Sequence, residues 1–351
     1  MKVAIVEGDG KVKLGEVPVP EPDEYQCLCK ILACATCTGT DLKIMNRKMS
    51  WAKDYPGVLG HESVGRAIKI GDKVRNIKEG DIFLRPTAVY FGEKLGNYSS
   101  LIGGFAEYGL VTDTKALLED KPNAEPNHYT IYQQKIPPDI AISPADATIL
   151  ITLKEISSFV ANVGVKFNSS LVILGAGPVA MSICFFAKLY GAYPVVVIGR
   201  RDEPLARMEK LGADFTVNNQ KEDMIVRVRE ITVGKGVNFI IDAAGNSALV
   251  SDASQSLASE GKIAVYATGS SSEDIVGHSK TLSEKDFIAA GPSEEMAHQY
   301  ILDIVKLKIV PLNTFYSHRL PFNKIEDGFE LLKKKKAFKV VFKMENGGEK
   351  G

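Results

Sequence analysis

Three side chains of the kinds that bind zinc in proteins occur close together near the start of the chain. Cys37 opens the sequence CTGTD, and His61 and Glu62 follow about twenty residues later in the sequence GHE. A thiolate, an imidazole and a carboxylate are typical zinc ligands, and zinc lowers the pKa of a bound water from about 15.7 to about 7. By the same electrostatics it would acidify a bound alcohol. These residues therefore predict a metal centre that activates a hydroxyl group.

A second group of residues suits a dinucleotide. The sequence GAGPVA begins at Gly175, directly after the apolar run 171–174, and opens a predicted helix. Gly175 permits a tight turn, Gly177 lets the backbone approach a pyrophosphate, and the helix N-terminus favours the phosphates. We expect Gly175, Gly177, Pro178 and Val179 to bind the cofactor. The alternative is a strand-to-helix turn without a ligand.

The end of the next predicted strand, 195–198, indicates which dinucleotide binds. An NAD site usually has an acidic residue there for the ribose 2′-hydroxyl, but this strand is followed by Gly199, Arg200 and Arg201. A small residue leaves room for a 2′-phosphate, and guanidinium groups bind phosphate through charge-assisted hydrogen bonds. We therefore predict NADP in preference to NAD. The alternative is that both arginines lie on a solvated loop.

The elements that must position these residues fall into two kinds. Up to about residue 120 the chain has short alternating runs punctuated by glycine and proline, which predict an all-β domain. From about 150, apolar strands alternate with helices, as in a doubly wound parallel sheet. A final strand, helix and strand follow. A length of 351 residues also favours two domains.

Composition excludes several classes of protein. The chain has 43 Lys and Arg and 43 Asp and Glu, so no net charge attracts nucleic acid or an anionic membrane. No apolar stretch approaches about 18 residues, and the N-terminus alternates like a strand instead of resembling a signal peptide. The cysteines are odd in number, at five, and four of them are crowded into the short segment 27–37, which does not suit a disulfide framework. We expect a cytoplasmic protein whose partners are neither nucleic acid nor membrane.

Four segments make the chain resemble the medium-chain dehydrogenase/reductase family, in its zinc-dependent alcohol and polyol dehydrogenase branch. They are the GHE segment, GGFAEY at 103–108, GAGPVA at 175–180 and HRLPFNKIEDGFELL at 318–332. The resemblance implies an α/β protein with a GroES-like, β-rich catalytic domain and a doubly wound Rossmann cofactor domain. The implied boundaries are 1–149 and 296–351 for the two parts of the catalytic domain and 150–295 for the Rossmann domain.

The resemblance also assigns metal ligands. His61 matches the family's zinc histidine, and Glu62 matches the glutamate that ligates zinc in polyol dehydrogenases. Cys37 lies one residue further from the following glycine than the family's cysteine, so an ungapped alignment places Thr38 at the ligand position. A one-residue bulge would restore Cys37 as a ligand; the alternative is a free cysteine. Because the four cysteines of the family's structural zinc are missing between about 85 and 115, we expect one catalytic zinc and no structural zinc.

Four further positions are assigned by the same resemblance. Polyol dehydrogenases often place a glutamate ligand where this chain has Ile151. Glu155 lies one helical turn away and would bind the metal directly or through water. The alternative is that Glu155 is an ordinary residue of the helix surface. Thr40 matches the hydroxyl that carries the proton away, although Lys43 replaces the histidine that often continues the relay. Lys339 matches a position that contacts cofactor phosphates in some relatives; the alternative is a solvated strand lysine.

The predicted function is therefore that of a zinc-dependent oxidoreductase. It would transfer hydride between NADP(H) and a secondary alcohol of a polyol, sugar or cyclitol, as a homodimer or homotetramer. Two alternatives remain from the sequence: a zinc-free NADPH quinone or enoyl reductase, and a nucleotide-binding sensor without turnover.

Overall fold

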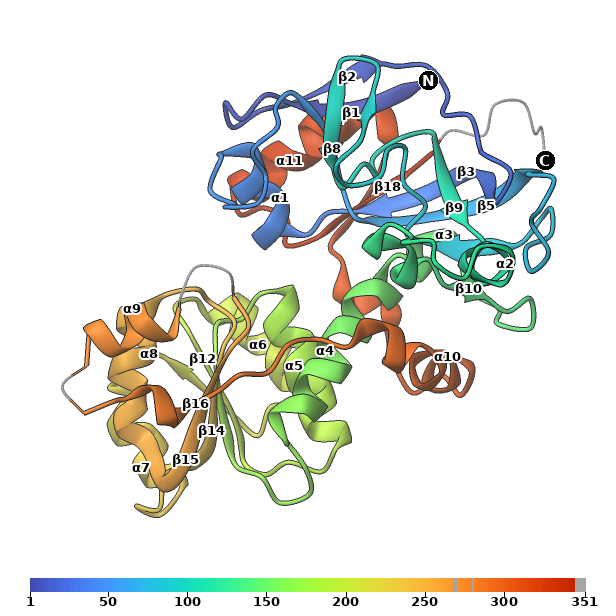
Figure 1. Ribbon diagram of the computed structural model, residues 1–351. Coiled ribbons are helices and arrows are strands. Elements are labelled where there is room, and N and C mark those ends of the chain that lie inside the picture. Colours follow the sequence, from blue (N-terminus) through green and yellow to red (C-terminus); the bar gives the residue numbers. More distant parts are fainter. Residues whose placement is uncertain (268–270, 280, 345–351) are drawn as a thin grey trace. The chain divides into compact units, whose positions relative to one another are not determined.

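The computed structural model of this protein describes residues 1–267, 271–279 and 281–344 (Figure 1). The chain divides into two compact units, one formed by 1–151 with 298–351 and the other by 152–297. The end of the predicted C-terminal segment 296–351, from 345 onward, lies outside the described residues. No helix in the described part is long and apolar enough to cross a membrane.

The first unit contains two β-sheets. One has the strand order β2-β1-β4-β8-β7, and the other has the order β10-β6-β5-β3-β18-β17, with β9 also paired to β3. The strands of the first sheet are β1 (Lys2–Val6), β2 (Val12–Glu16), β4 (Gly57–Leu59), β7 (Lys94–Leu95) and β8 (Tyr98–Leu101). Those of the second are β3 (Gln26–Ala35), β5 (Glu62–Ile70), β6 (Ile82–Leu84), β9 (Tyr108–Thr112), β10 (Lys135–Ile136), β17 (His318–Pro321) and β18 (Val340–Lys343).

Helices of the first unit are short and connect or cover these sheets. The α-helices are α1 (Thr38–Met45), α2 (Thr114–Asp120), α3 (Pro144–Ala147), α10 (His298–Lys306) and α11 (Ile325–Lys333). The 3-10 helices are η1 (His128–Tyr132), η5 (Leu312–Phe315) and η6 (Phe322–Lys324).

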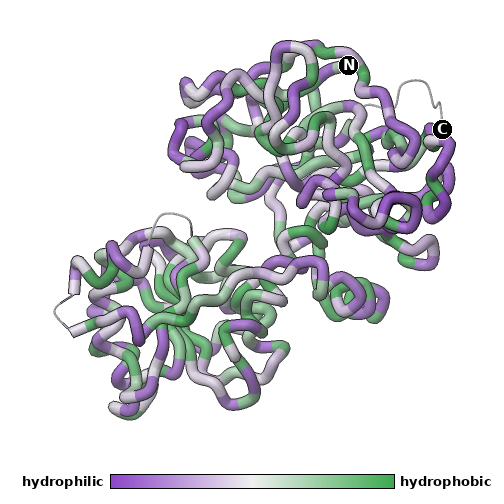
Figure 2. Tube along the Cα trace, in the orientation of Figure 1, coloured by the Kyte–Doolittle hydropathy of each residue, from purple (hydrophilic) through white to green (hydrophobic). Residues whose placement is uncertain are grey.

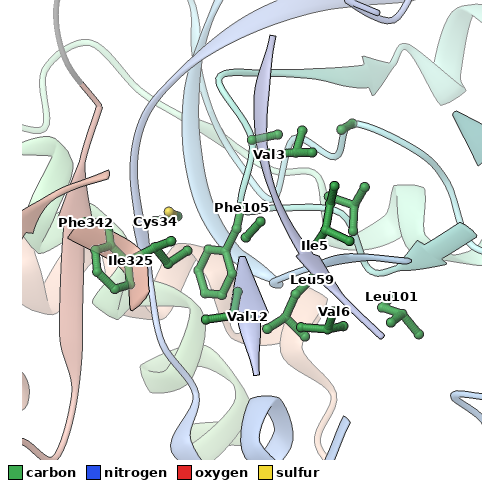
Figure 3. Close-up of a cluster of buried hydrophobic side chains, with 14 of the residues drawn as sticks. Val3, Ile5, Val6, Val12, Cys34, Leu59, Leu101, Phe105, Ile325 and Phe342 are labelled. Carbon is green, nitrogen blue, oxygen red and sulfur yellow. The ribbon is translucent and has the colours of Figure 1, made fainter. Parts of the chain in front are cut away.

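Both ends of the chain build the hydrophobic core of the first unit. Phe105 packs edge-on against Phe342 from the C-terminal strand, with 6.1 Å between ring centroids (Figure 3). Val3 and Ile5 from β1 and Ile325 from α11 belong to the same buried cluster. Because β18 pairs antiparallel with β3, the C-terminal strand is an integral part of the sheet that carries the zinc-type residues.

The second unit is a six-stranded parallel sheet with the order β13-β12-β11-β14-β15-β16. Its most apolar strands are central (Figure 2). The strands are β11 (Leu171–Leu174), β12 (Val195–Gly199), β13 (Phe215–Asn218), β14 (Val237–Asp242), β15 (Leu257–Val265) and β16 (Phe287–Ile288). The helices are α4 (Ile149–Val163), α5 (Pro178–Leu189), α6 (Asp202–Lys210), α7 (Met224–Ile231), α8 (Ser247–Ala253), α9 (Ser272–Gly277), η2 (Ser254–Ser256), η3 (Glu284–Asp286) and η4 (Glu294–Ala297).

The predicted doubly wound sheet is thus confirmed. The strand order runs outward in one direction from β11 to β13 and in the other from β14 to β16. Ligands of such sheets bind at the carboxyl ends of the strands, at the point where the order reverses. That point lies between β11 and β14, next to the turn that begins at Gly175.

Candidate active site

Cys37, His61 and Glu62 lie close together because β3 ends beside the start of the neighbouring strand β5. β3 and β5 are antiparallel, and Ala35 near the end of β3 lies opposite Glu62, the first residue of β5. Cys37 follows as the N-cap residue of α1, and His61 directly precedes β5. The three ligand-type atoms all lie within 4.8 Å of one another. A thiol, an imidazole and a carboxylate therefore face one point.

The turn before His61 requires glycine. Gly60 has a φ of +104°, which L side chains rarely adopt, and a Cβ atom there would lie 2.5 Å from the Phe105 ring. The amide of Gly104 also donates to the carbonyl oxygen of Gly60, with 2.6 Å between the atoms. This close packing holds the GHE segment against the core and directs His61 toward Cys37.

Asp41 completes the buried polar cluster. One carboxylate oxygen accepts a hydrogen bond from the Cys37 amide at 2.8 Å, and the other lies 3.7 Å from Nδ1 of His61. Burial raises the pKa of Asp41 to about 8, against the opposing effect of His61. Neither Nδ1 of His61 nor the nearby Asp41 oxygen has a hydrogen-bond partner among the described residues. A bound cation would favour the ionised carboxylate, so these residues fit a metal ion.

Glu62 forms a buried ion pair with Lys339, and both side chains are almost fully excluded from solvent. Lys339 reaches this position because β18, which it precedes, pairs with β3 beside the cluster. A contact of Lys339 with cofactor phosphate stays a prediction. The observed partner of Lys339 is Glu62, so in this structure the lysine neutralises a carboxylate that would otherwise be a buried uncompensated charge.

Of Cys37 and Thr38, only Cys37 has its side chain beside His61 and Glu62. The Thr38 hydroxyl donates to the carbonyl oxygen of Phe338 at 2.8 Å and so points into the chain's own backbone. Cys37 Sγ lies 3.5 Å from the hydroxyl oxygen of Thr40 and belongs to the converging group. Among the described residues, Cys34 and Cys37 form no disulfide.

One supporting residue had no signal in the sequence. Arg85 is buried, has a φ of +59°, and donates from Nη1 to the carbonyl oxygen of His61 at 2.9 Å. Its guanidinium lies over the rings of Tyr129 and Tyr132. No residue near Arg85 in the sequence indicates metal chemistry, so only the structure shows that Arg85 fixes the backbone of His61.

Glu155 lies in the second unit, on α4, where its carboxylate accepts a hydrogen bond from the Tyr266 hydroxyl at 3.3 Å. Ile151, at the position where polyol dehydrogenases carry a glutamate, is fully buried and apolar. The role of Glu155 as a metal ligand stays a prediction.

The dinucleotide-type turn has the backbone that its sequence predicts. Gly175 has a φ of +109° and donates from its amide to the carbonyl oxygen of Ile198 at 2.8 Å. Gly177 is the N-cap residue of α5, Pro178 is in its first turn, and Val179 follows. A Cβ atom on Gly177 would meet nothing within 4 Å. Packing inside the protein therefore does not require this glycine, whereas the approach of a ligand would.

Two positively charged residues follow the end of β12. Arg200 and Arg201 follow Gly199 and are both exposed. The nearby acidic group of Asp202 is already bound, by the Asn218 amide at 2.7 Å and by the Lys221 ammonium at 2.6 Å. Little negative charge is thus left to repel a phosphate at the two arginines.

Two family models match the chain. The alcohol dehydrogenase GroES-like domain matches residues 23–121, and the zinc-binding dehydrogenase domain matches residues 178–296. The first match confirms the expected GroES-like character of the β-rich unit.

Curated relatives match over nearly the whole chain. An L-threonine 3-dehydrogenase of Pyrococcus horikoshii is 28% identical over 94% of each chain. A sorbitol dehydrogenase of Bacillus subtilis is 27% identical over 78% of this chain and 76% of its own. Among solved structures, the alcohol dehydrogenase TADH from Thermus sp. ATN1 superposes with a TM-score of 0.78 at 22% identity, covering 98% of this chain and all of its own. That likeness supports the fold.

Proposed function

Because the chain belongs to the zinc-dependent medium-chain dehydrogenase/reductase family and is an oxidoreductase of the alcohol dehydrogenase type, we propose that it transfers hydride between NADP(H) and a secondary alcohol of a polyol, sugar or cyclitol. The observation that carries the proposal is the convergence of Cys37, His61 and Glu62. The metal-free reductase and the sensor without turnover, the two alternatives from sequence, would not need such a group.

Cys37, His61 and Glu62 would hold one zinc ion, with Glu155 as a further ligand. When bound, this ion supplies the positive charge that acidifies the substrate's hydroxyl group. Asp41 faces His61 and holds the Cys37 backbone, so it fixes the orientation of two ligands.

The protein's own side chains would then transfer the proton of the substrate's hydroxyl group. Oxidation of an alcohol to a ketone removes a proton from oxygen and a hydride from carbon, and the hydride goes to the nicotinamide ring. The Thr40 hydroxyl lies beside Cys37 and is the group placed to relay the proton, accepting it from the substrate while passing its own proton to solvent. Lys339 forms a buried ion pair with Glu62 and so holds this carboxylate in place.

The cofactor would be NADP in preference to NAD. Gly199 places no acidic side chain at the end of β12, and Arg200 and Arg201 offer guanidinium groups for a 2′-phosphate. The pyrophosphate would lie against Gly175, Gly177, Pro178 and Val179 at the start of α5.

The substrate class is supported by the relative named sorbitol dehydrogenase, since sorbitol is a polyol. A hydroxy amino acid is the second candidate, favoured by the relatives named L-threonine 3-dehydrogenase. We also propose a homodimer or homotetramer, because β16 leaves one edge of the cofactor sheet available for pairing. A cytoplasmic location is proposed from the odd number and crowding of the cysteines.

Cofactor choice can be tested by replacing both arginines with glutamine. The dissociation constant for NADPH, measured by fluorescence titration, should rise about tenfold or more, since each charged hydrogen bond contributes about 1.5–3 kcal/mol. Binding of NADH should change less than about twofold. The control is Arg227→Gln, because Arg227 is exposed in the same unit and pairs with Glu230. Equal or better catalytic efficiency of the wild type with NAD would contradict the NADP proposal.

A further inference from the structure

A groove on the first unit has a strongly basic lining. It has a volume of about 1240 Å³ and is bordered by β3, β5, β17, β18 and α3. Four cationic side chains line it, and no carboxylate does. They are Lys30, Arg66, Arg319 and Lys343. Because the whole chain has no net charge, this clustering is local and not a consequence of composition.

The cations lie side by side on one face of the sheet. Lys30 on β3 is directly opposite Arg66 on β5 in the strand register. Like charges in that arrangement repel and destabilise a sheet. Lys343 on β18 lies opposite Ala33 on β3, and Arg319 is on β17, the next strand. The four strands span about 14 Å, so the positive charge forms a band across the sheet.

Most of this charge is unbalanced. Among the described residues, Arg319 pairs with Asp146, whose carboxylate also accepts from the Tyr316 hydroxyl. Within the same part of the chain, Lys30, Arg66 and Lys343 have no ion pair. Between the cations the lining is apolar, with Leu32, Ile68 and Val341. The groove therefore combines a cationic rim with an aliphatic floor.

We propose that this groove binds a nucleoside polyphosphate. Arginine binds phosphate oxygens in a bidentate manner and lysine binds them as a point charge, and the aliphatic floor suits the flat face of a base. The volume exceeds that of a typical small-molecule pocket, about 300–1,000 Å³, so such a ligand fits. The lining is hollowed between α3 and the sheet, which a flat membrane surface would not fill.

The groove is separate from the candidate active site and from the dinucleotide turn. Its residues include none of Cys37, His61 and Glu62. Arg66 lies four residues beyond Glu62 on the same strand, which is about 13 Å away. The turn at Gly175 belongs to the other unit.

The test is calorimetric titration of the full-length protein with ATP, with NADP present at saturation to fill the dinucleotide turn. We expect binding that Lys30→Gln and Arg66→Gln each weaken about tenfold or more, as expected for charged hydrogen bonds. The matched control is Lys69→Gln, because Lys69 is exposed on β5 outside the groove lining, and it should change affinity less than about twofold. Both groove variants should fold and melt no lower than the wild type, since each removes a like-charge contact.

Absence of ATP binding, or binding unchanged in Arg66→Gln, would overturn the proposal. Equal affinity for tripolyphosphate and ATP would overturn its nucleoside part, and binding of phosphatidylglycerol vesicles without ATP binding would replace it with a membrane surface. Failure of NADP to bind would count against the proposed function alone, because Arg66→Gln reports on the groove in the first unit.

Discussion

The metal-type cluster and the dinucleotide turn are built in opposite ways. The cluster gathers Cys37, His61 and Glu62 from two strands, and Arg85 and Lys339 support it from distant parts of the sequence. The turn from Gly175 to Val179 is one continuous segment whose geometry is set by its own backbone. The first site depends on buried charge held by tertiary contacts, and the second on local conformation. Substitutions should therefore have large, coupled effects in the cluster and small, separable ones in the turn.

The largest effect should come from the ligands. Cys37→Ser and His61→Gln should abolish stoichiometric zinc, measured by atomic emission after dialysis, and lower kcat by about 10⁴-fold, because the metal contributes several kcal/mol to the barrier. Thr38→Val is the matched control, since its hydroxyl contacts the Phe338 backbone, and it should retain zinc. Full zinc content and activity in Cys37→Ser would remove Cys37 from the ligands.

The next effect should appear in stability. Lys339→Met leaves Glu62 buried without its partner and should lower the free energy of unfolding by about 3–5 kcal/mol. The double variant with Glu62→Gln should recover much of this loss, because no buried charge then remains. Urea denaturation of the wild type, both single variants and the double variant gives the coupling free energy between Lys339 and Glu62. Additive effects in this cycle would mean that the pair is not coupled.

The smallest effects separate the two glycines of the turn. Gly175→Ala should cost about 1–3 kcal/mol of stability because the position has a φ of +109°. Gly177→Ala should leave thermal unfolding almost unchanged, since its Cβ would meet nothing within 4 Å, yet weaken NADPH binding. Thermal melts and NADPH titrations of Gly175→Ala and Gly177→Ala check these two predictions. Unchanged NADPH affinity in Gly177→Ala would contradict close approach of the pyrophosphate.

Local patterns predicted the fold and the core of each site. Alternation of strands and helices predicted the parallel sheet, and the GHE segment together with Cys37 predicted the thiol, imidazole and carboxylate that the antiparallel pairing of β3 and β5 brings together. Long-range contacts escaped prediction. The ion pair of Lys339 with Glu62 depends on β18 joining β3, which no local pattern specifies. Arg85 was missed for the same reason.

Metal-dependent turnover tests the account most directly. NADP reduction would be measured with a panel of polyols, sugars, cyclitols and hydroxy amino acids, on the protein as purified, after chelation, and after zinc is restored. We predict activity with at least one secondary alcohol that disappears on chelation and returns with zinc. Activity that chelation leaves unchanged would contradict the role assigned to Cys37, His61 and Glu62 and would favour a zinc-free reductase.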